Sequence, residues 1–436
     1  MRRAHIVTPG ARGCRLAAVT ERSRLWRHPD FLRLWAAQAV SAYGSRITRT
    51  ALPIIAITLL HQPESVVGVL MAAQLAPGVI LALFAGGFID RGNKRRILIG
   101  ADLIRAVAVA SLTLVWALDV LSTMHVLVVG AIVGAASAMF AITDNAYLPA
   151  LIGKSQLAEG NAKLESTEAI AEITGPASAG VLIAALGAPL AVAIDAVSYL
   201  WSAVILGRIR AREAPHVPAP PTASLSLSLR GGDLEVGMRA VFGHPIVRPI
   251  VVSHMVWSLS GGFFMALYTP FCLRELGLSI SVFGVIVAMG GVGSLAGALL
   301  SRAAVRTLGL GRTLVLTSAL SLACALFIPL AAGPFVVIVA FLIAHQLLSD
   351  GFSVAFVIQA VTLRQTVLRK DVLGRANAAI HVCTASLLPV GALLAGFLAE
   401  IIGTRNAVWT GVLIGLVPPL LLLPLWKLRD MPPAAS

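Results

Sequence analysis

The sequence predicts an all-α membrane protein with twelve transmembrane helices in two six-helix bundles. Hydrophobic residues make up 58% of the 436-residue chain and charged residues only 12%, about half the charged share of an average soluble domain. The mean hydropathy is +0.88. Apolar runs of about 20 residues, long enough to cross a bilayer as a helix, recur along the whole chain. Soluble domains of this size could not be covered by so few charges.

Twelve apolar runs follow one another with short polar connections. They are continuous rather than alternating, which excludes the strands of a transmembrane barrel. The expected spans are residues 32–60, 65–89, 97–118, 124–148, 165–187, 190–207, 246–271, 281–304, 313–332, 334–362, 376–400 and 405–427.

The distribution of positive charge predicts the orientation. Most of the 34 Lys and Arg residues fall in the two tails and in every second loop, whereas the intervening loops hold only Arg274 and Arg405. Because cytoplasmic loops retain Lys and Arg, we expect both termini to be cytoplasmic. The net charge of +14 then reflects topology rather than a nucleic-acid-binding surface. The first 30 residues lack the apolar core of a removable signal peptide, so we expect this basic tail to lie against lipid headgroups or to reflect an over-long start.

A Pro/Ser-rich stretch divides the chain into two halves. Residues 208–244 are expected to form a cytoplasmic linker between bundles at 31–207 and 245–428, with tails at 1–30 and 429–436. A shift of 216 residues aligns landmarks of the two halves, and six spans per half make equivalent helices cross in the same direction. The sequence therefore predicts a parallel repeat. The matched landmarks are His28-Pro29 with His244-Pro245, Gly68 with Gly284, Arg96 with Arg312, Asn161 with Asn377, and Gly175 and Gly180 with Gly391 and Gly396.

The loop after the second span reads GGFIDRGNKRR over residues 86–96. A carboxylate at a helix end, followed by turn residues and cations, suits a latch that forms in one state and opens in another. A loop made basic only to set orientation is the alternative. The pattern resembles the loop signature of the major facilitator superfamily, which implies a gating role for Gly86, Asp90, Arg91, Lys94 and Arg95. The equivalent loop in the second half lacks the aspartate.

The fifth span contains Gly175, Pro176 and Gly180. Proline removes a backbone hydrogen bond and glycines allow close helix approach, so a kinked, tightly packed helix is one interpretation. The run also resembles the G-P-x-x-x-G core of the span-5 motif of facilitator antiporters, which implies bending during export. Further stretches, including residues 31–35 and 195–199, resemble the branch with macrolide-efflux and enterobactin-export proteins.

Charges inside the spans are candidate functional groups, because each costs about 2.5–3.5 kcal/mol or more at a helix centre. Arg46 and Arg49 lie near the middle of the first span, and Asp350 near the middle of the tenth. We expect Asp350 to exchange protons, with Glu172 as the second candidate. Gln38, Ser41, Tyr43, Arg46 and Asp350 are expected to line the substrate cavity, although Arg46 could instead form a static ion pair. Asp102, Arg105 and Asp144 are expected to form structural pairs.

No enzyme motif competes with this interpretation. Walker, H-E-x-x-H and G-x-S-x-G patterns are absent, and the four cysteines and His254, His345 and His381 show no metal-ligand spacing. We therefore expect neither catalysis, cofactor nor metal. The predicted function is secondary active efflux of small, drug-like organic compounds across the bacterial cell membrane by proton antiport and alternating access, by a monomer that contacts lipids but no nucleic acid. A siderophore or secreted-metabolite exporter and a non-transporting membrane sensor are the alternatives.

Overall fold

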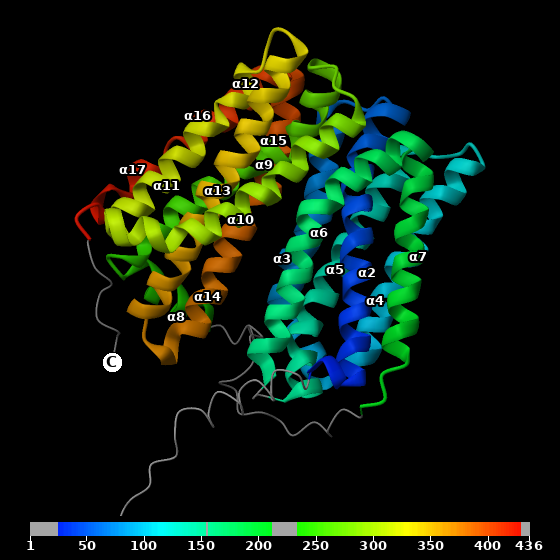
Figure 1. Cartoon of the computed structure of the whole chain (residues 1–436), viewed down its shortest axis with the longest axis horizontal. Coiled ribbons are helices and arrows are strands. Elements are labelled where there is room, and N and C mark those ends of the chain that lie inside the picture. Colours follow the sequence, from blue (N-terminus) through cyan, green and yellow to red (C-terminus); the bar gives the residue numbers. More distant parts are fainter. Residues whose placement is uncertain (1–24, 154–155, 212–232, 429–436) are drawn as a thin grey trace, which may run out of the picture.

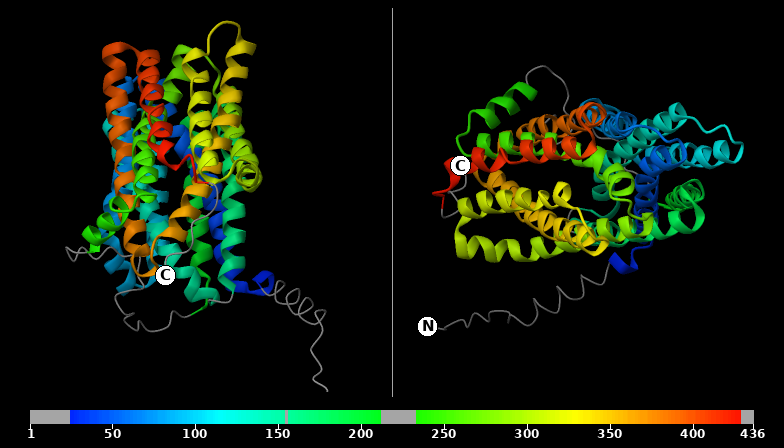
Figure 2. Two further views of the ribbon diagram at one scale, coloured as in Figure 1. Left: turned by 90° about the vertical axis from the view of Figure 1, so that its left-hand side faces the viewer. Right: turned by 90° about the horizontal axis from the view of Figure 1, so that it is seen from above.

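The structure is a computed structural model that describes residues 25–153, 156–211 and 233–428. Within these ranges every regular element is a helix, which confirms the predicted all-α class. The helices form two groups that stand side by side, α2 to α7 in one and α8 to α17 in the other (Figure 1). Two further views show the same two bundles, with long helices running roughly parallel (Figure 2).

The first half begins with a short 3-10 helix and continues with six long helices. One of them, α2, passes directly into a π-helical turn, η2. The elements are η1 (Leu25–Arg27), α2 (Pro29–Ile54), η2 (Ile55–Leu59), α3 (Glu64–Arg91), α4 (Lys94–Ala117), α5 (Thr123–Ile152), α6 (Leu157–Leu186) and α7 (Ala188–Gly207).

The second half uses more, shorter helices, because three of the predicted spans are each interrupted within the apolar run. Its elements are α8 (Asp233–Phe242), α9 (Val247–Pro270), the π-helix η4 (Phe271–Glu275), α10 (Ile280–Leu308), α11 (Leu310–Ala325), α12 (Phe327–Leu330), α13 (Phe335–Val367), α14 (Lys370–Ala385), α15 (Leu387–Ile402), α16 (Thr404–Gly415), α17 (Pro418–Leu422) and η5 (Leu423–Leu425).

Eleven helical segments of the described chain are long and apolar enough to cross a membrane. The helix α2 is not one of the eleven. It has the length, with 26 residues continued by the five of η2, but it carries Asp30, Arg33, Arg46 and Arg49. The predicted first span is thus the least apolar.

The structure keeps the shift of 216 residues between the halves. The helices α3 and α10 begin at Glu64 and Ile280, and α4 and α11 begin at Lys94 and Leu310. The π-helices η2 and η4, at residues 55–59 and 271–275, obey the same shift. A widened turn at one position of both halves is therefore a property of the repeat.

A histidine caps the first long helix of each half. His28 Nδ1 accepts a hydrogen bond from the backbone N–H of Phe31 (3.1 Å). His244 Nδ1 accepts the equivalent bond from Val247 (3.4 Å). An imidazole nitrogen thereby satisfies one of the free N–H groups that every helix start leaves. The His-Pro landmarks of the sequence are these caps.

The two halves meet at glycines in two equivalent helix crossings. At the α3–α15 crossing, a Cβ on Gly68 would lie 2.5 Å from the carbonyl oxygen of Ala392. At the α6–α10 crossing, a Cβ on Gly180 would lie 3.0 Å from Cα of Gly284. Only glycine permits backbones this close.

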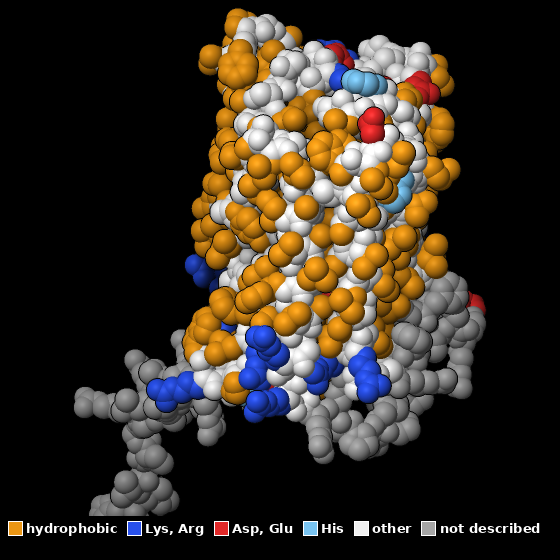
Figure 3. Space-filling view, turned by 90° about the vertical axis from the view of Figure 1, so that its right-hand side faces the viewer, with side chains coloured by type: hydrophobic (Ala, Val, Ile, Leu, Met, Phe, Trp, Pro, Cys, Tyr) orange, Lys and Arg blue, Asp and Glu red, His pale blue; other side chains and the backbone are white. Residues whose placement is uncertain are grey.

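The two ends of the molecule differ in charge and in packing. The crossings lie toward the end of the molecule where α12 lies, and the bundles diverge toward the end where α8 lies (Figure 1). Lys and Arg side chains gather at the α8 end, on the face seen in Figure 3. We refer to it as the basic end and to the opposite one as the far end.

One helix was not predicted. The expected linker 208–244 contains α8, which packs on α14 with Gly237 against the carbonyl group of Arg375. Leu234, Met238 and Val241 recur at helical spacing, which gives this short segment an apolar face. Residues 212–232 of the predicted linker lie outside the described chain.

Candidate substrate cavity and charge cluster

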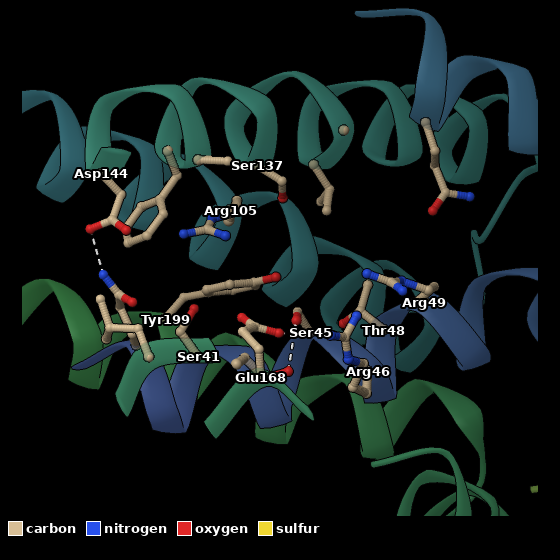
Figure 4. A pocket seen from close by; sticks show the side chains of 18 of the residues that line it. Ser41, Ser45, Arg46, Thr48, Arg49, Arg105, Ser137, Asp144, Glu168 and Tyr199 are labelled. Carbon is tan, nitrogen blue, oxygen red and sulfur yellow. Dashed lines mark hydrogen bonds and ion pairs between the residues drawn. The ribbon is translucent and has the colours of Figure 1, made fainter. Parts of the chain in front are cut away.

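A cavity of about 640 Å³ lies among the helices of the first half. Its wall comes from α2 to α7, and α9 of the second half contributes Met265. Side chains with hydroxyl, amide and charged groups face it from several helices (Figure 4). The polar and charged residues that line it are Gln38, Ser41, Ser45, Arg46, Thr48, Arg49, Gln74, Arg105, Ser137, Asp144, Asn145, Asn161, Glu165, Glu168 and Tyr199.

The helix α2 supplies more of the polar and charged lining residues than any other helix. Gln38, Ser41 and Arg46 line the cavity. Tyr43 does not belong to the lining, and its side chain is 37% exposed. Two residues correspond to about 200° around a helix, so Tyr43 points away from the side that Ser41 faces. The prediction for Tyr43 is corrected accordingly.

Arg46 is the centre of an ion-pair cluster. Its Nη2 lies 2.7 Å from a carboxylate oxygen of Glu168 and 2.7 Å from one of Glu172. The Arg46 side chain is 10% exposed, and the two carboxylate side chains are 52% and 53% exposed. The cluster thus ties α2 to α6 with a buried cation and two half-exposed anions.

The predicted span-5 motif supports this cluster. A Cβ on Gly175 would lie 2.6 Å from Cγ of Arg46, so the glycine makes room for the arginine. Five residues on, Gly180 lies against α10 of the second half. Pro176 is buried within the helix. The motif therefore contacts the charge cluster at one end and the other bundle at the other end.

Arg49 lies one turn beyond Arg46 and points into the cavity beside it (Figure 4). Among the described residues it has no hydrogen bond or ion pair. The sequence identified Arg49 as an intramembrane charge but not as a cavity residue. Its spacing of three from Arg46 was the available signal, since residues at i and i+3 share a helix face.

Asp144 is held by an amide rather than by a cation. Gln38 Nε2 donates a hydrogen bond to its Oδ1 over 2.5 Å. The prediction of a structural ion pair for Asp144 is therefore wrong, and the residue lines the cavity. Asn145, Asn161 and Glu165 also line the cavity. They were not predicted from the sequence, although polar residues within or beside apolar runs are a signal that could have identified them.

Asp102 and Arg105 form the expected pair. Arg105 Nη2 contacts Oδ1 of Asp102, and its guanidinium carbon lies 4.6 Å and 4.3 Å from the ring centroids of Phe140 and Tyr199. Stacking on two aromatic faces, with a carboxylate partner, lets a guanidinium group be buried. This pair therefore fixes α4 against α5 and α7.

Asp350 lies outside the cavity, at the junction of α13 and α10. A Cβ on Gly290 would contact its carboxylate, and one on the next residue, Gly291, would lie 2.5 Å from the side chain of Ile173. Ile173 follows Glu172, so the two predicted proton-exchange residues flank the same stretch of α10. Asp350 makes no hydrogen bond or ion pair with another described residue. Arg46 is bonded to Glu172 and Glu168 instead.

The predicted gating loop is described in part. The side chains of Asp90 and Arg91 and the surroundings of Gly86 lie outside the described part of the structure. Arg95 Nε donates to the carbonyl oxygen of Leu206 (2.9 Å), and Nη2 bonds that of Gly207. Arginine at the C-terminus of α7 satisfies free carbonyl groups and the helix dipole. Lys94 opens α4.

Two helical bundles related by a sequence repeat, with a polar cavity inside a shell of membrane-length helices, define a multi-pass membrane transporter. Residues 34–388 match the family model of the Major Facilitator Superfamily, and the chain belongs to that superfamily. This confirms the predicted family and a multi-pass location in the cell membrane. Its members are transporters rather than enzymes.

Two curated relatives place the chain near the drug exporters of the superfamily. Macrolide efflux protein A of Streptococcus pyogenes is 30% identical over 182 residues, 41% of this chain and 44% of that protein. The multidrug efflux pump Tap of Mycolicibacterium fortuitum is 28% identical over 237 residues, 53% of this chain and 56% of that protein. The chain thus spans about half the length of the curated relatives it matches.

Solved structures share the fold. A bacterial homologue of the iron transporter ferroportin in the inward-facing state gives a TM-score of 0.71 at 17% identity, covering 91% of this chain and 98% of that one. The same homologue in the outward-facing state gives 0.60 at 17% identity, covering 92% and 100%. The inward-facing arrangement is the more similar of the two.

Proposed function

We propose that this protein is a secondary active exporter of small, drug-like organic compounds, driven by exchange for protons. One observation carries the proposal. A polar cavity in the first half adjoins the Arg46–Glu168–Glu172 cluster. Asp350 of the second half, a carboxylate with no counter-ion among the described residues, lies against the stretch of α10 that contacts α6 of the first half. Similarity to macrolide and multidrug efflux proteins supports the substrate class and the direction.

The proposed topology has twelve spans and cytoplasmic termini. The helix α2 with η2 serves as the first span. It packs against α6 and α7 like its neighbours, and its charges face the cavity or its own bundle rather than lipid. The basic end is the cytoplasmic one by the positive-inside rule, and the far end is extracellular.

In this topology the structure corresponds to an inward-facing state. The halves touch through the glycine crossings near the far end and diverge toward the basic end (Figure 1). The higher TM-score with an inward-facing structure supports the same assignment. Substrate would load from the cytoplasm into the cavity, and rocking of the two bundles would expose it outside.

Charge counting favours Asp350 as the proton site. Arg46 and Arg49 are balanced by Glu168 and Glu172, and Asp350 adds one more carboxylate against the same corner of α6 and α10. An ionised group without a partner is costly inside a membrane, and a bound proton removes that cost. Glu172 is less suited to this role, because Arg46 already holds it as an anion over 2.7 Å.

Purified protein in liposomes tests the function. A proton gradient is imposed so that protons flow in the direction opposite to substrate transport. Wild type should then concentrate a macrolide or a fluorescent cationic dye against its gradient, and collapse of the proton gradient should abolish this accumulation. Asp350→Asn should equilibrate substrate without concentrating it. Asp119→Asn is the matched control, since Asp119 is exposed in a loop with a positive φ of 58° that asparagine adopts readily.

The outcomes separate the parts of the proposal. Uphill transport by Asp350→Asn would assign the proton site elsewhere, with Glu172→Gln the next variant. Equal transport by wild type with the gradient collapsed would overturn proton antiport itself.

A further inference from the structure

Polar contacts join the two halves at the far end. Arg274 of η4 donates through Nη2 to the carbonyl oxygen of Ile57 (3.0 Å), and its Nη1 lies 3.4 Å from Oε1 of Glu64. The side chains of Arg274 and Glu64 are 33% and 17% exposed. Beside them, the Ser65 hydroxyl donates to the carboxylate of Glu400. Both interactions run from the first half to the second.

These contacts surround the α3–α15 crossing. Gly396 lies against the first turn of α3, where its Cβ would be 2.7 Å from the carbonyl oxygen of Glu64 and 2.9 Å from Cα of Ser65. The polar groups therefore surround the glycine contact between α3 and α15, and we refer to them as its rim. Separation of α3 from α15 must break them.

The equivalent α6–α10 crossing lacks this rim. The shift of 216 residues places Ile280 at the equivalent of Glu64, and Ala184 at the equivalent of Glu400. Thr58 takes the place of Arg274, and its hydroxyl donates to Ile54 of its own helix (2.8 Å). Charged contacts between the halves are thus confined, among these equivalent positions, to one of two otherwise similar crossings.

Arg274 and Arg405 are the two cations that the sequence places in far-end loops, and they behave differently. Arg405 Nε lies 2.7 Å from Oε1 of Glu275, and Nη1 donates to the carbonyl oxygen of Pro329 (2.9 Å). All three residues belong to the second half. Arg405 therefore stabilises one bundle, whereas Arg274 reaches across to the other.

We propose that Arg274, Glu64, Ser65 and Glu400 form a far-end latch, which holds the extracellular side closed while substrate loads and must open for its release. The latch rests on the alternating access proposed above. Partly exposed ion pairs contribute modestly, so the latch can bias the equilibrium between the two states without locking it.

Distance measurements between spin labels at positions 61 and 406 test the latch. Both positions are exposed at the far end, one in each half. In the labelled, otherwise intact protein, Glu64→Gln and Ser65→Ala should each raise the population with a long far-end distance, about five-fold for the charged residue. Glu275→Gln is the matched control, because it removes a far-end ion pair within one half. It should leave the populations at the wild-type ratio.

Three results would overturn the inference in distinguishable ways. Wild-type populations in both latch variants would remove these residues from the gate while leaving alternating access intact. An equal shift in Glu275→Gln would reduce the effect to general loosening of the far end. A single distance in wild type, whether protons or substrate are added, would contradict alternating access and the latch with it.

Discussion

Gly175 of α6 lies against the aliphatic part of Arg46 of α2, so close that a methyl group at position 175 would come within 2.6 Å of Cγ of the arginine. The sequence marks the two residues for different reasons, one in a span-5 motif and the other as an intramembrane charge. In the structure they form one contact. The geometry of the ion-pair cluster therefore depends on the absence of a side chain at 175.

Gly175→Ala should displace Arg46 and lengthen its pairs with Glu168 and Glu172. Overpacking of this kind typically costs about 1–3 kcal/mol, so the melting temperature in detergent should fall together with export. Gly207→Ala is the control, because no atom lies within 4 Å of a Cβ at that position. Equal melting temperatures for the two variants would contradict the contact.

Arg46→Gln should destabilise the protein, because it leaves two carboxylates without their cation. Half-exposed anions keep part of their hydration, so we expect a loss of about 1–3 kcal/mol rather than the full cost of a buried pair. Combined with Glu168→Gln, the loss should be smaller than the sum of the single changes, by about 0.5 kcal/mol or more. Denaturant unfolding of the four proteins measures this coupling, and additive losses would argue against it.

Arg49→Gln should behave in the opposite way. Arg49 has no hydrogen bond or ion pair among the described residues and faces the cavity. Its removal should therefore change the free energy of unfolding little, by about 0.5 kcal/mol or less. Substrate affinity should change instead, which equilibrium binding to the purified protein can measure. A destabilisation as large as that of Arg46→Gln, with unchanged binding, would assign Arg49 a structural role.

Asp30 predicts a pH dependence. It lies in the first turn of α2, before the predicted span 32–60. Burial alone would raise the pKa of its carboxyl group. The N–H groups of Arg210 (3.1 Å) and Ala211 (2.9 Å) and the guanidinium of Arg33 (2.5 Å) outweigh burial and lower the pKa overall.

A lowered folded-state pKa means that the stabilisation by Asp30 is fully present above the ordinary carboxyl pKa of about 4 and is lost as the pH falls through the folded-state value. Asp30→Asn should therefore unfold more easily than wild type at pH 7, and the difference should shrink in acid. Thermal unfolding of both proteins at pH 7 and at a pH below the ordinary carboxyl pKa checks this. A difference independent of pH would show that the carboxylate charge is not what matters.

The sequence predicted the helices and the repeat well, because membrane spans depend on composition over long windows and because the landmarks recur at one shift. It did not reveal η2 or η4. Pro53 and Pro270 lie just before these π-helices, but a proline within a helix indicates a kink without specifying a π-turn. Tyr43 was misplaced because residues close in sequence were grouped without their helical phase.

For the predicted site residues, the sequence did not reveal which helices bring them together. Asp350 and Glu172 could be ranked by depth alone, whereas the glycine pair at 290 and 291 that brings them to one corner depends on packing between α6, α10 and α13. Within the described part of the chain, the side-chain partner of Asp144 is the amide of Gln38 on another helix rather than a cation. Helix-to-helix contacts of this kind are set by side-chain packing, which composition does not encode.

The carbonyl group of Ile57, near the end of the first long helix, is bonded by a residue of the other half. A helix end leaves carbonyl groups without internal partners, and here the other half supplies the donor through Arg274. At the position equivalent to Arg274, the first half has Thr58, whose hydroxyl donates to its own helix. Through Arg274 the second half thus completes a helix end of the first half, whereas Thr58 makes no reciprocal contact among the described residues. The halves are complementary parts rather than interchangeable ones, because two copies of the first half would carry a threonine at both positions and could not supply this donor.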